Sequence, residues 1–84
     1  MSKRLFQQIN PLSVNKGDRY IVLLPCNYQK EQFNQWDYVF ATGIVYFNKA
    51  EAIVQVSKTE ITDTEEQENV FWLPYENLVK EVHQ

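Results

Sequence analysis

The chain has 84 residues, which is enough for one domain, and 44% of them are apolar, a fraction that supports a hydrophobic core and excludes a disordered chain. Its single cysteine excludes an intramolecular disulfide, and no stretch of about 18 apolar residues is present that would span a membrane as a helix. The net charge of −3 hides an asymmetry, because a basic first third is followed by an acidic last third.

Residues 1–14 are predicted to form a short N-terminal arm in front of a folded domain at residues 15–84. Leu5 and Ile9 are four residues apart, a spacing typical of one helical turn, which Pro11 would end. We expect the apolar side chains of the arm to cover one end of the domain.

The two basic residues of the arm, Lys3 and Arg4, are not followed by the apolar segment of a secretory leader. Together with the single cysteine, this leads us to expect a protein of the reducing cytoplasm. The same two residues leave a second role open for the arm, in which it contacts nucleic acid.

A turn and a strand open the predicted domain. Gly17 and Asp18 are typical turn residues, and the apolar run at residues 20–24 indicates a strand that Pro25 ends. The polar stretch at residues 27–35 is predicted to be a long loop, and long loops in compact domains are often functional.

The middle of the chain predicts a hairpin with strands at residues 36–47 and 50–57. Gly43 lies inside the first of these strands and indicates a bulge or a sharp bend. In the second strand the small apolar residues alternate with Glu51, Ile53 and Gln55, so we expect an inward-facing set: Ala52, Val54 and Val56.

Both faces of the strand at residues 36–47 carry apolar side chains, although only one face can line the core. One set is Val39, Ala41, Val45 and Phe47, and the other is Tyr38, Phe40, Ile44 and Tyr46. The set that does not enter the core is either covered by the N-terminal arm or exposed as a surface that binds a partner.

An acidic segment follows the hairpin. Residues 60–84 contain seven acidic residues against one basic residue, and five of the seven lie close together: Glu60, Asp63, Glu65, Glu66 and Glu68. Two interpretations of these five are open, a solvated loop and a docking loop for a basic partner.

The end of the chain predicts a strand at residues 70–73, a single 3₁₀ turn set by Pro74, and a closing strand at residues 78–82. With the preceding strands this makes five short antiparallel strands. We therefore expect a small, closed, all-β barrel.

From about residue 16 to residue 82 the chain resembles the SH3-like small β-barrels. The residues that carry the resemblance are Gly17-Asp18, Gly43-Ile44-Val45, residues 52–56, Phe71-Trp72-Leu73-Pro74 and Asn77-Leu78-Val79. The resemblance implies a five-stranded SH3-like antiparallel barrel with a 3₁₀ turn before the last strand. It implies no single function, because such barrels serve as peptide readers, ribosomal modules and subunits of larger complexes. Leu78 stands where proline-reading members carry a tyrosine, so proline-rich ligands are not expected.

Aromatic side chains in the long loop and in the strand after it are the candidate binding residues, because aromatic rings often anchor protein interfaces. They are Tyr28, Phe33, Trp36, Tyr38, Phe40 and Tyr46. The alternative is that these rings pack together as a small cluster under the loop.

No catalytic, metal or cofactor site is expected. His83 is the only histidine and lies next to the C-terminal residue, and Cys26 has no other histidine to activate it as a nucleophile. Asp18, Glu51 and Glu76 follow no pattern that would pair them as acid and base. We therefore expect no enzyme activity.

The preferred hypothesis is a non-catalytic protein-binding module, either a small subunit, an adaptor or an inhibitor. It would dock on a larger protein through the aromatic loop and the strand at residues 36–47, with the acidic loop steering a basic partner. The alternative is a nucleic-acid-associated regulatory protein that uses the basic arm, which the pI of about 5.0 disfavours. Self-association through the surplus apolar face is compatible with both.

Overall fold

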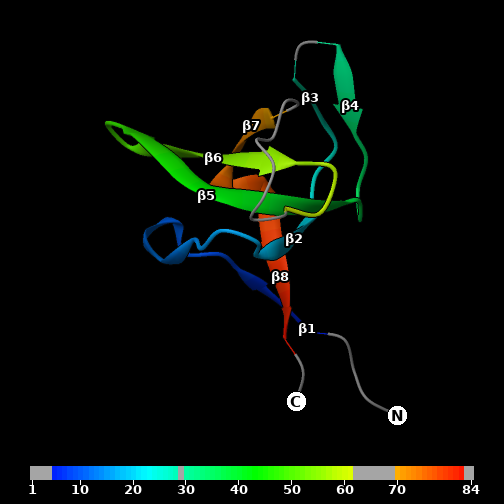
Figure 1. Cartoon of the computed structure of the whole chain (residues 1–84), viewed down its shortest axis with the longest axis horizontal. Coiled ribbons are helices and arrows are strands. Elements are labelled where there is room, and N and C mark those ends of the chain that lie inside the picture. Colours follow the sequence, from blue (N-terminus) through cyan, green and yellow to red (C-terminus); the bar gives the residue numbers. More distant parts are fainter. Residues whose placement is uncertain (1–4, 29, 62–69, 83–84) are drawn as a thin grey trace.

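The computed structural model describes residues 5–28, 30–61 and 70–82. In these ranges the chain is all-β, with eight strands and two short 3₁₀ helices (Figure 1). Six strands form one antiparallel sheet, and in spatial order they are β1 (Leu5–Gln8), β8 (Leu78–Val82), β2 (Arg19–Val22), β5 (Tyr38–Asn48), β6 (Glu51–Ser57) and β7 (Val70–Pro74). No helix within the described ranges has the length and apolar character needed to cross a membrane.

The segment expected to be a long polar loop contains a hairpin instead. Strand β3 (Cys26–Tyr28) pairs with β4 (Glu31–Phe33) as a separate two-stranded sheet. Phe71 of β7 contacts both strands, since its ring centroid lies 6.1 Å from that of Tyr28 and 5.3 Å from that of Phe33. The loop prediction is wrong because two aromatic rings in a polar stretch pack against a strand that lies far away in the sequence.

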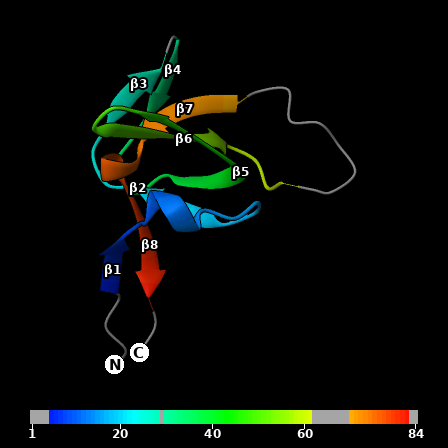
Figure 2. The ribbon, with the colours of Figure 1, turned by 90° about the vertical axis from the view of Figure 1, so that its left-hand side faces the viewer.

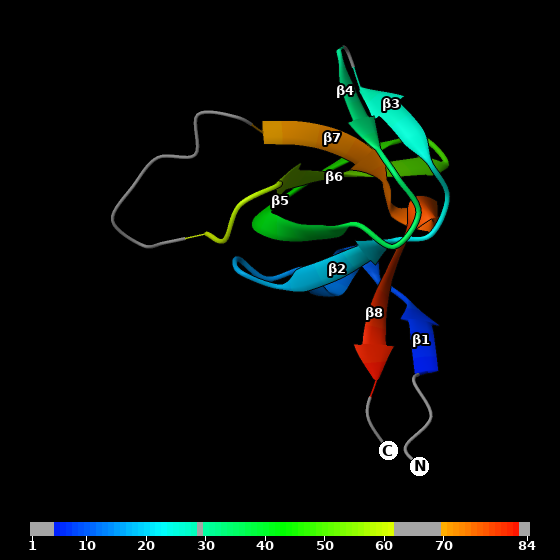
Figure 3. The same ribbon diagram turned by 90° about the vertical axis from the view of Figure 1, so that its right-hand side faces the viewer.

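The main sheet is open and does not form the closed barrel that we expected. Strand β1 lies at one edge and β7 at the other, and no pairing among the described strands joins them. The edge of β8 that faces away from β2 is occupied by β1, while the β3–β4 hairpin lies against β7 (Figure 3). The two edges of the sheet therefore lie against different segments and do not pair with each other to close a barrel.

The N-terminal segment Leu5–Gln8 is a strand and not the predicted helical turn. It pairs with β8 from Leu5 opposite Val82 to Gln8 opposite Val79, and the two strands extend side by side away from the rest of the sheet (Figure 2). A single turn of helix is unstable on its own, so pairing with a neighbouring strand outweighs one favourable spacing. Pro11 begins the short 3₁₀ helix η1 (Pro11–Ser13), whose first turn is capped by the Asn10 side chain.

The hydrophobic core lies on the inner face of the main sheet. The predicted inward-facing residues of β6 are buried, and so are Val39 and Ala41 of β5. Ile9 is only 3% exposed and packs in the same cluster, so this part of the predicted arm covers the core. The buried cluster is formed by Ile9, Tyr20, Val22, Phe33, Val39, Ala41, Val54, Val56, Leu73 and Leu78.

The bulge predicted at Gly43 is confirmed. Ala41 lies opposite Val56 and Val45 opposite Val54, so four residue steps along β5 match two along β6. Gly43 has a φ of 97°, and a Cβ atom at this position would lie 3.3 Å from the backbone nitrogen of Lys16. The bend therefore brings β5 close to the turn that precedes β2.

That turn is formed by residues 15–18 and is tied to β5 by two backbone hydrogen bonds. The Gly17 N–H donates to the Ala41 carbonyl and the Ala41 N–H donates to the Asp18 carbonyl, each at 2.8 Å. Within the turn, the Asp18 N–H donates to the Asn15 carbonyl, and the Asn15 N–H donates to Oδ2 of Asp18 at 2.9 Å. Gly17 takes a φ of 91°, a value that glycine adopts without strain.

The buried Tyr20 hydroxyl also donates to Oδ2 of Asp18, at 3.0 Å. Burial raises the pKa of the Tyr20 phenol far above its usual value of 10.0, and the negative charge and the hydrogen bond of Asp18 raise it further. The folded protein therefore holds this proton more tightly than the unfolded chain does.

The 3₁₀ turn predicted before the last strand is confirmed as η2 (Tyr75–Asn77), which connects β7 to β8. It is fixed from two sides. The Gln8 side-chain amide donates to the Tyr75 carbonyl at 2.7 Å, and the Leu23 N–H donates to the Asn77 carbonyl at 2.7 Å. Through Gln8, the N-terminal strand β1 thus holds the 3₁₀ turn that leads into the last strand.

Gly43→Ala is expected to lower the free energy of unfolding by about 2–3 kcal/mol, because it combines an unfavourable backbone conformation with crowding against Lys16. Gly17→Ala is the matched control, since Gly17 has a similar φ but nothing within 4 Å of a Cβ atom, and it should cost only about 1 kcal/mol. Urea unfolding followed by circular dichroism measures both. Equal losses would mean that Gly43 does not lie against the turn.

Tyr20→Phe is expected to change how stability depends on pH. Because the pKa of Tyr20 is raised in the folded state, its contribution is complete below about pH 10 and is lost as the pH rises above this value. The free energy of unfolding of the wild type should exceed that of Tyr20→Phe by about 1 kcal/mol at about pH 8. This difference should shrink between about pH 10 and 11. Urea unfolding across this range tests the prediction, and a constant difference would contradict it.

Candidate functional site

The outer face of the main sheet carries a second apolar layer. Ile21 lies opposite Tyr38 on one side and opposite Val79 on the other, so the three side chains share this face. Ile21 is 2% exposed and Val79 is 5% exposed, yet neither belongs to the core cluster. Other side chains must therefore cover them on the outer face.

We call Phe6, Trp36 and Tyr38 the outer aromatic cluster. Phe6 and Trp36 are in contact, with ring centroids 5.2 Å apart, although Phe6 lies on β1 and Trp36 lies in the turn before β5, at the other end of the β1-β8-β2-β5 strand order. The Arg19 guanidinium lies 4.6 Å from the centre of the Tyr38 ring. The three rings remain 37%, 51% and 44% exposed, respectively, and so present a large apolar surface to solvent.

Trp36 is held in a turn that is unusual for a tryptophan. In residues 34–37 the Asp37 N–H donates to the Asn34 carbonyl at 3.1 Å, and the Asn34 N–H donates to Oδ2 of Asp37 at 2.9 Å. Trp36 is the third residue of this turn and has a φ of 75°. A bulky residue rarely adopts this left-handed conformation, which costs about 1–3 kcal/mol.

The same chain contains a matching turn at residues 15–18, where the third residue is Gly17. Both turns begin with Asn, end with Asp and have the same internal hydrogen bonds. Both are tied to a neighbouring strand in the same way, since the Trp36 N–H donates to the Val22 carbonyl and the Val22 N–H donates to the Asp37 carbonyl. The turn at 15–18 thus has the residue that its backbone favours, whereas the turn at 34–37 has tryptophan instead.

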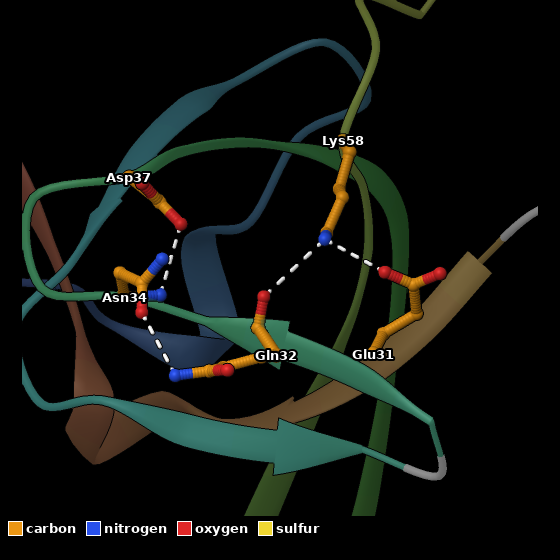
Figure 4. A network of polar contacts seen from close by, with 5 residues as sticks. All are labelled: Glu31, Gln32, Asn34, Asp37 and Lys58. Carbon is orange, nitrogen blue, oxygen red and sulfur yellow. Dashed lines mark hydrogen bonds and ion pairs between the residues drawn. The ribbon is translucent and has the colours of Figure 1, made fainter.

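Polar contacts hold the turn at residues 34–37 and the strand before it (Figure 4). The Gln32 side-chain amide donates to Oδ1 of Asn34 at 3.1 Å. Lys58, which directly follows β6, donates to Oε2 of Glu31 at 2.8 Å and lies 4.7 Å from the centre of the Phe33 ring. Because the Lys58 and Glu31 side chains are 41% and 48% exposed, this ion pair between β4 and the segment after β6 contributes little to stability.

A second group of exposed apolar side chains lies near the end of the β5–β6 hairpin. Ile44, Tyr46 and Phe47 are each more than half exposed. Tyr46 lies opposite Ile53, whereas Phe47 lies opposite Ala52, so the two rings point to opposite faces of the hairpin. This part of the hairpin is thus apolar on both faces.

The six aromatic residues predicted to bind a partner have different surroundings. Trp36, Tyr38 and Tyr46 are exposed, whereas Tyr28 and Phe40 are half-buried. The prediction for Phe33 is wrong, because its ring is completely buried in the core, between Phe71 and Lys58. The cluster that the structure assembles therefore includes two of the six, Trp36 and Tyr38.

The predicted acidic docking loop is described only at its start, where Glu60 is exposed. Asp63, Glu65, Glu66 and Glu68 lie outside the described residues, as do Lys3, Arg4 and His83. Both roles proposed for these charged segments therefore stay predictions.

Two members of the site, Phe6 and Arg19, were not identified from the sequence. Phe6 was assigned to the N-terminal arm, and its contact with Trp36 depends on long-range strand pairing. A local signal was available for the turn, because the pattern Asn-x-x-Asp occurs at residues 15–18 and again at residues 34–37 with Gly replaced by Trp. A tryptophan at the position where the matching turn has glycine is therefore the sequence signal that distinguishes Trp36 from the other aromatic residues.

The described residues contain no group of three or more His, Cys, Asp or Glu side chains that could hold a metal ion. Cys26 is a free, half-buried cysteine that packs against the core. The arrangement on the outer face offers aromatic rings and a guanidinium, groups that are common in protein interfaces.

Comparison with models of known protein families, with curated proteins and with solved structures finds no match for this chain. The chemistry of the described residues is therefore the basis on which a function can be proposed.

Trp36→Gly is expected to be more stable than Trp36→Ala by about 1 kcal/mol. Both substitutions remove the ring, but only glycine relieves the left-handed backbone conformation. This reverses the usual order, in which alanine is the more stabilising residue. Urea unfolding of the two variants measures the difference.

The other non-glycine residue with positive φ among those described, Lys49 at 54°, provides the control. Lys49→Gly should likewise be more stable than Lys49→Ala, because this pair differs in the same way. If Trp36→Ala equals or exceeds Trp36→Gly while the Lys49 pair behaves as expected, the turn at residues 34–37 is not strained.

Proposed function

We propose that this protein is a non-catalytic protein-binding module that docks on a larger protein through the outer aromatic cluster. The observation that carries the proposal is the position of Trp36, a half-exposed tryptophan in a backbone conformation that favours glycine. Residues strained in this way cluster at functional sites, and a glycine at the matching position of the turn at residues 15–18 avoids the strain.

The composition of the cluster supports binding to a protein. Tryptophan, tyrosine and arginine are the residues that most often dominate interface energies. Trp36 and Tyr38 belong to the cluster, and Arg19 lies against the Tyr38 ring. The rings are already ordered before a partner binds, since Phe6 contacts Trp36 and Arg19 stacks on Tyr38. A pre-ordered surface loses less conformational entropy on binding.

We also propose that the fold is related to the SH3-like small barrels. Five neighbouring strands of the main sheet, in the order β8-β2-β5-β6-β7, and the 3₁₀ turn before β8 support this relationship. Small barrels of this type act as modules of larger assemblies, and a role as a small subunit, adaptor or inhibitor is consistent with a surface built for contact and not for catalysis.

The proposal predicts that the tagged wild-type chain captures a protein partner from lysate. The amount of this partner that is captured should fall about tenfold or more with Trp36→Gly and with Tyr38→Ala. Leu12→Ser is the matched control, because Leu12 is 81% exposed in η1 and lies outside the cluster. Quantitative mass spectrometry compares the four baits, and circular dichroism confirms that each is folded.

Nuclease treatment of the lysate distinguishes this function from binding of nucleic acid. The partner should remain bound after nuclease, because the cluster contacts protein directly. Retention of the same partner by both cluster variants, or its loss with nuclease, would contradict the proposed function.

A further inference from the structure

A cavity of about 260 Å³ lies where β6 begins, β7 ends and η2 follows. A smaller hollow of about 60 Å³, at the end of the β5–β6 hairpin, shares the residues Glu51 and Ile53 with it. The two hollows therefore adjoin each other at Glu51 and Ile53, and we call the two together the groove. Its lining residues away from the shared pair include Tyr46 on one side and Pro74, Tyr75 and Glu76 on the other.

The floor of this groove is an apolar row that the strand register creates. Ile53 of β6 lies opposite Tyr46 of β5 and also opposite Pro74 of β7, so the three side chains line up across three strands. Tyr75, which follows Pro74, is half-buried and packs against the core. The floor is thus built from rigid, paired strands.

Two carboxylates flank the floor. Glu51 and Glu76 are both exposed, and the carboxylate of neither forms a hydrogen bond or an ion pair with another described residue. No lysine or arginine is among the residues that line the groove. The groove therefore combines an apolar floor with negative charge that has no positive counterpart within it.

We propose that this groove binds a lysine or arginine side chain from an extended segment of a partner protein. The aliphatic part of such a side chain would lie along Ile53 and Pro74, and its charged head would lie between Glu51 and Glu76. Charge complementarity selects this occupant, and the net charge of −3 of the whole chain acts in the same direction.

This inference goes beyond the proposed function, since none of the groove residues belongs to the outer aromatic cluster. A partner that uses both surfaces would place its basic segment in the groove. The two surfaces are tested with different variants, so failure of one proposal leaves the other standing.

The test titrates ¹⁵N-labelled full-length chain with acetylated, amidated hexapeptides Ala-Val-X-Val-Ala-Thr, in which X is Arg, Lys, Gln or Glu. The Arg and Lys peptides should cause saturable shifts of the backbone amide signals of residues 51–53 and 75–77, and the Gln and Glu peptides should not. Raising the salt concentration should weaken the binding of the basic peptides, because the carboxylates are exposed.

Glu51→Gln and Glu76→Gln are each expected to weaken binding of the Arg peptide about 2- to 5-fold, the range for an exposed ion pair. Glu60→Gln is the matched control, because it removes an exposed carboxylate that does not line the groove. The proposal is overturned if the Arg and Gln peptides bind equally, if no saturable shift occurs in residues 51–53 and 75–77, or if the control weakens binding as much as the groove variants do.

Discussion

The reciprocal pairing of β2 and β5 is the constraint on which the rest of this structure depends. Each of the two strands is preceded by an Asn-x-x-Asp turn, and each turn forms two backbone hydrogen bonds with the other strand, at Ala41 in one case and at Val22 in the other. The pair is therefore fixed at both ends. Because side chains alternate along a strand, this register decides that Val22, Val39 and Ala41 face the core and that Ile21 and Tyr38 face outward.

The parts of the fold that could be predicted are those that short-range patterns determine. Alternation in residues 52–56 predicted the inner face of β6, Gly43 predicted the bulge, and Pro74 predicted the 3₁₀ turn before the last strand. The parts that could not be predicted depend on contacts between distant segments. The spacing of Leu5 and Ile9 predicts a helical turn, but pairing with β8 makes this segment a strand. Phe33 is predicted to contact a partner, but its ring packs 5.3 Å from the ring of Phe71.

The candidate site likewise combines residues that the sequence predicts with residues that only long-range pairing brings together. Trp36 and Tyr38 were identified from their residue type and from the surplus apolar face of the strand that contains Tyr38. Phe6 was not identified as a contact residue, because only the β1–β8 pairing places it near Trp36. The N-terminal strand contributes Phe6 to the cover of this face, as one of the two interpretations expected, while the rings themselves stay 37% to 51% exposed. Binding of a partner by this face stays a prediction.

The strained backbone of Trp36 lowers the stability of this small domain. A chain of 84 residues has a small core and a net stability of about 4–13 kcal/mol, so a strained Trp36 uses a substantial part of it. A glycine at the same position would remove the strain, as the turn at residues 15–18 demonstrates. Where a folded protein departs from the local rules of structure, the departure is often at a functional or strained site and is compensated elsewhere in the fold. The two proposals are compatible with each other, because in a complex the outer aromatic cluster would supply apolar contact area and the groove between Glu51 and Glu76 would supply selectivity for charge.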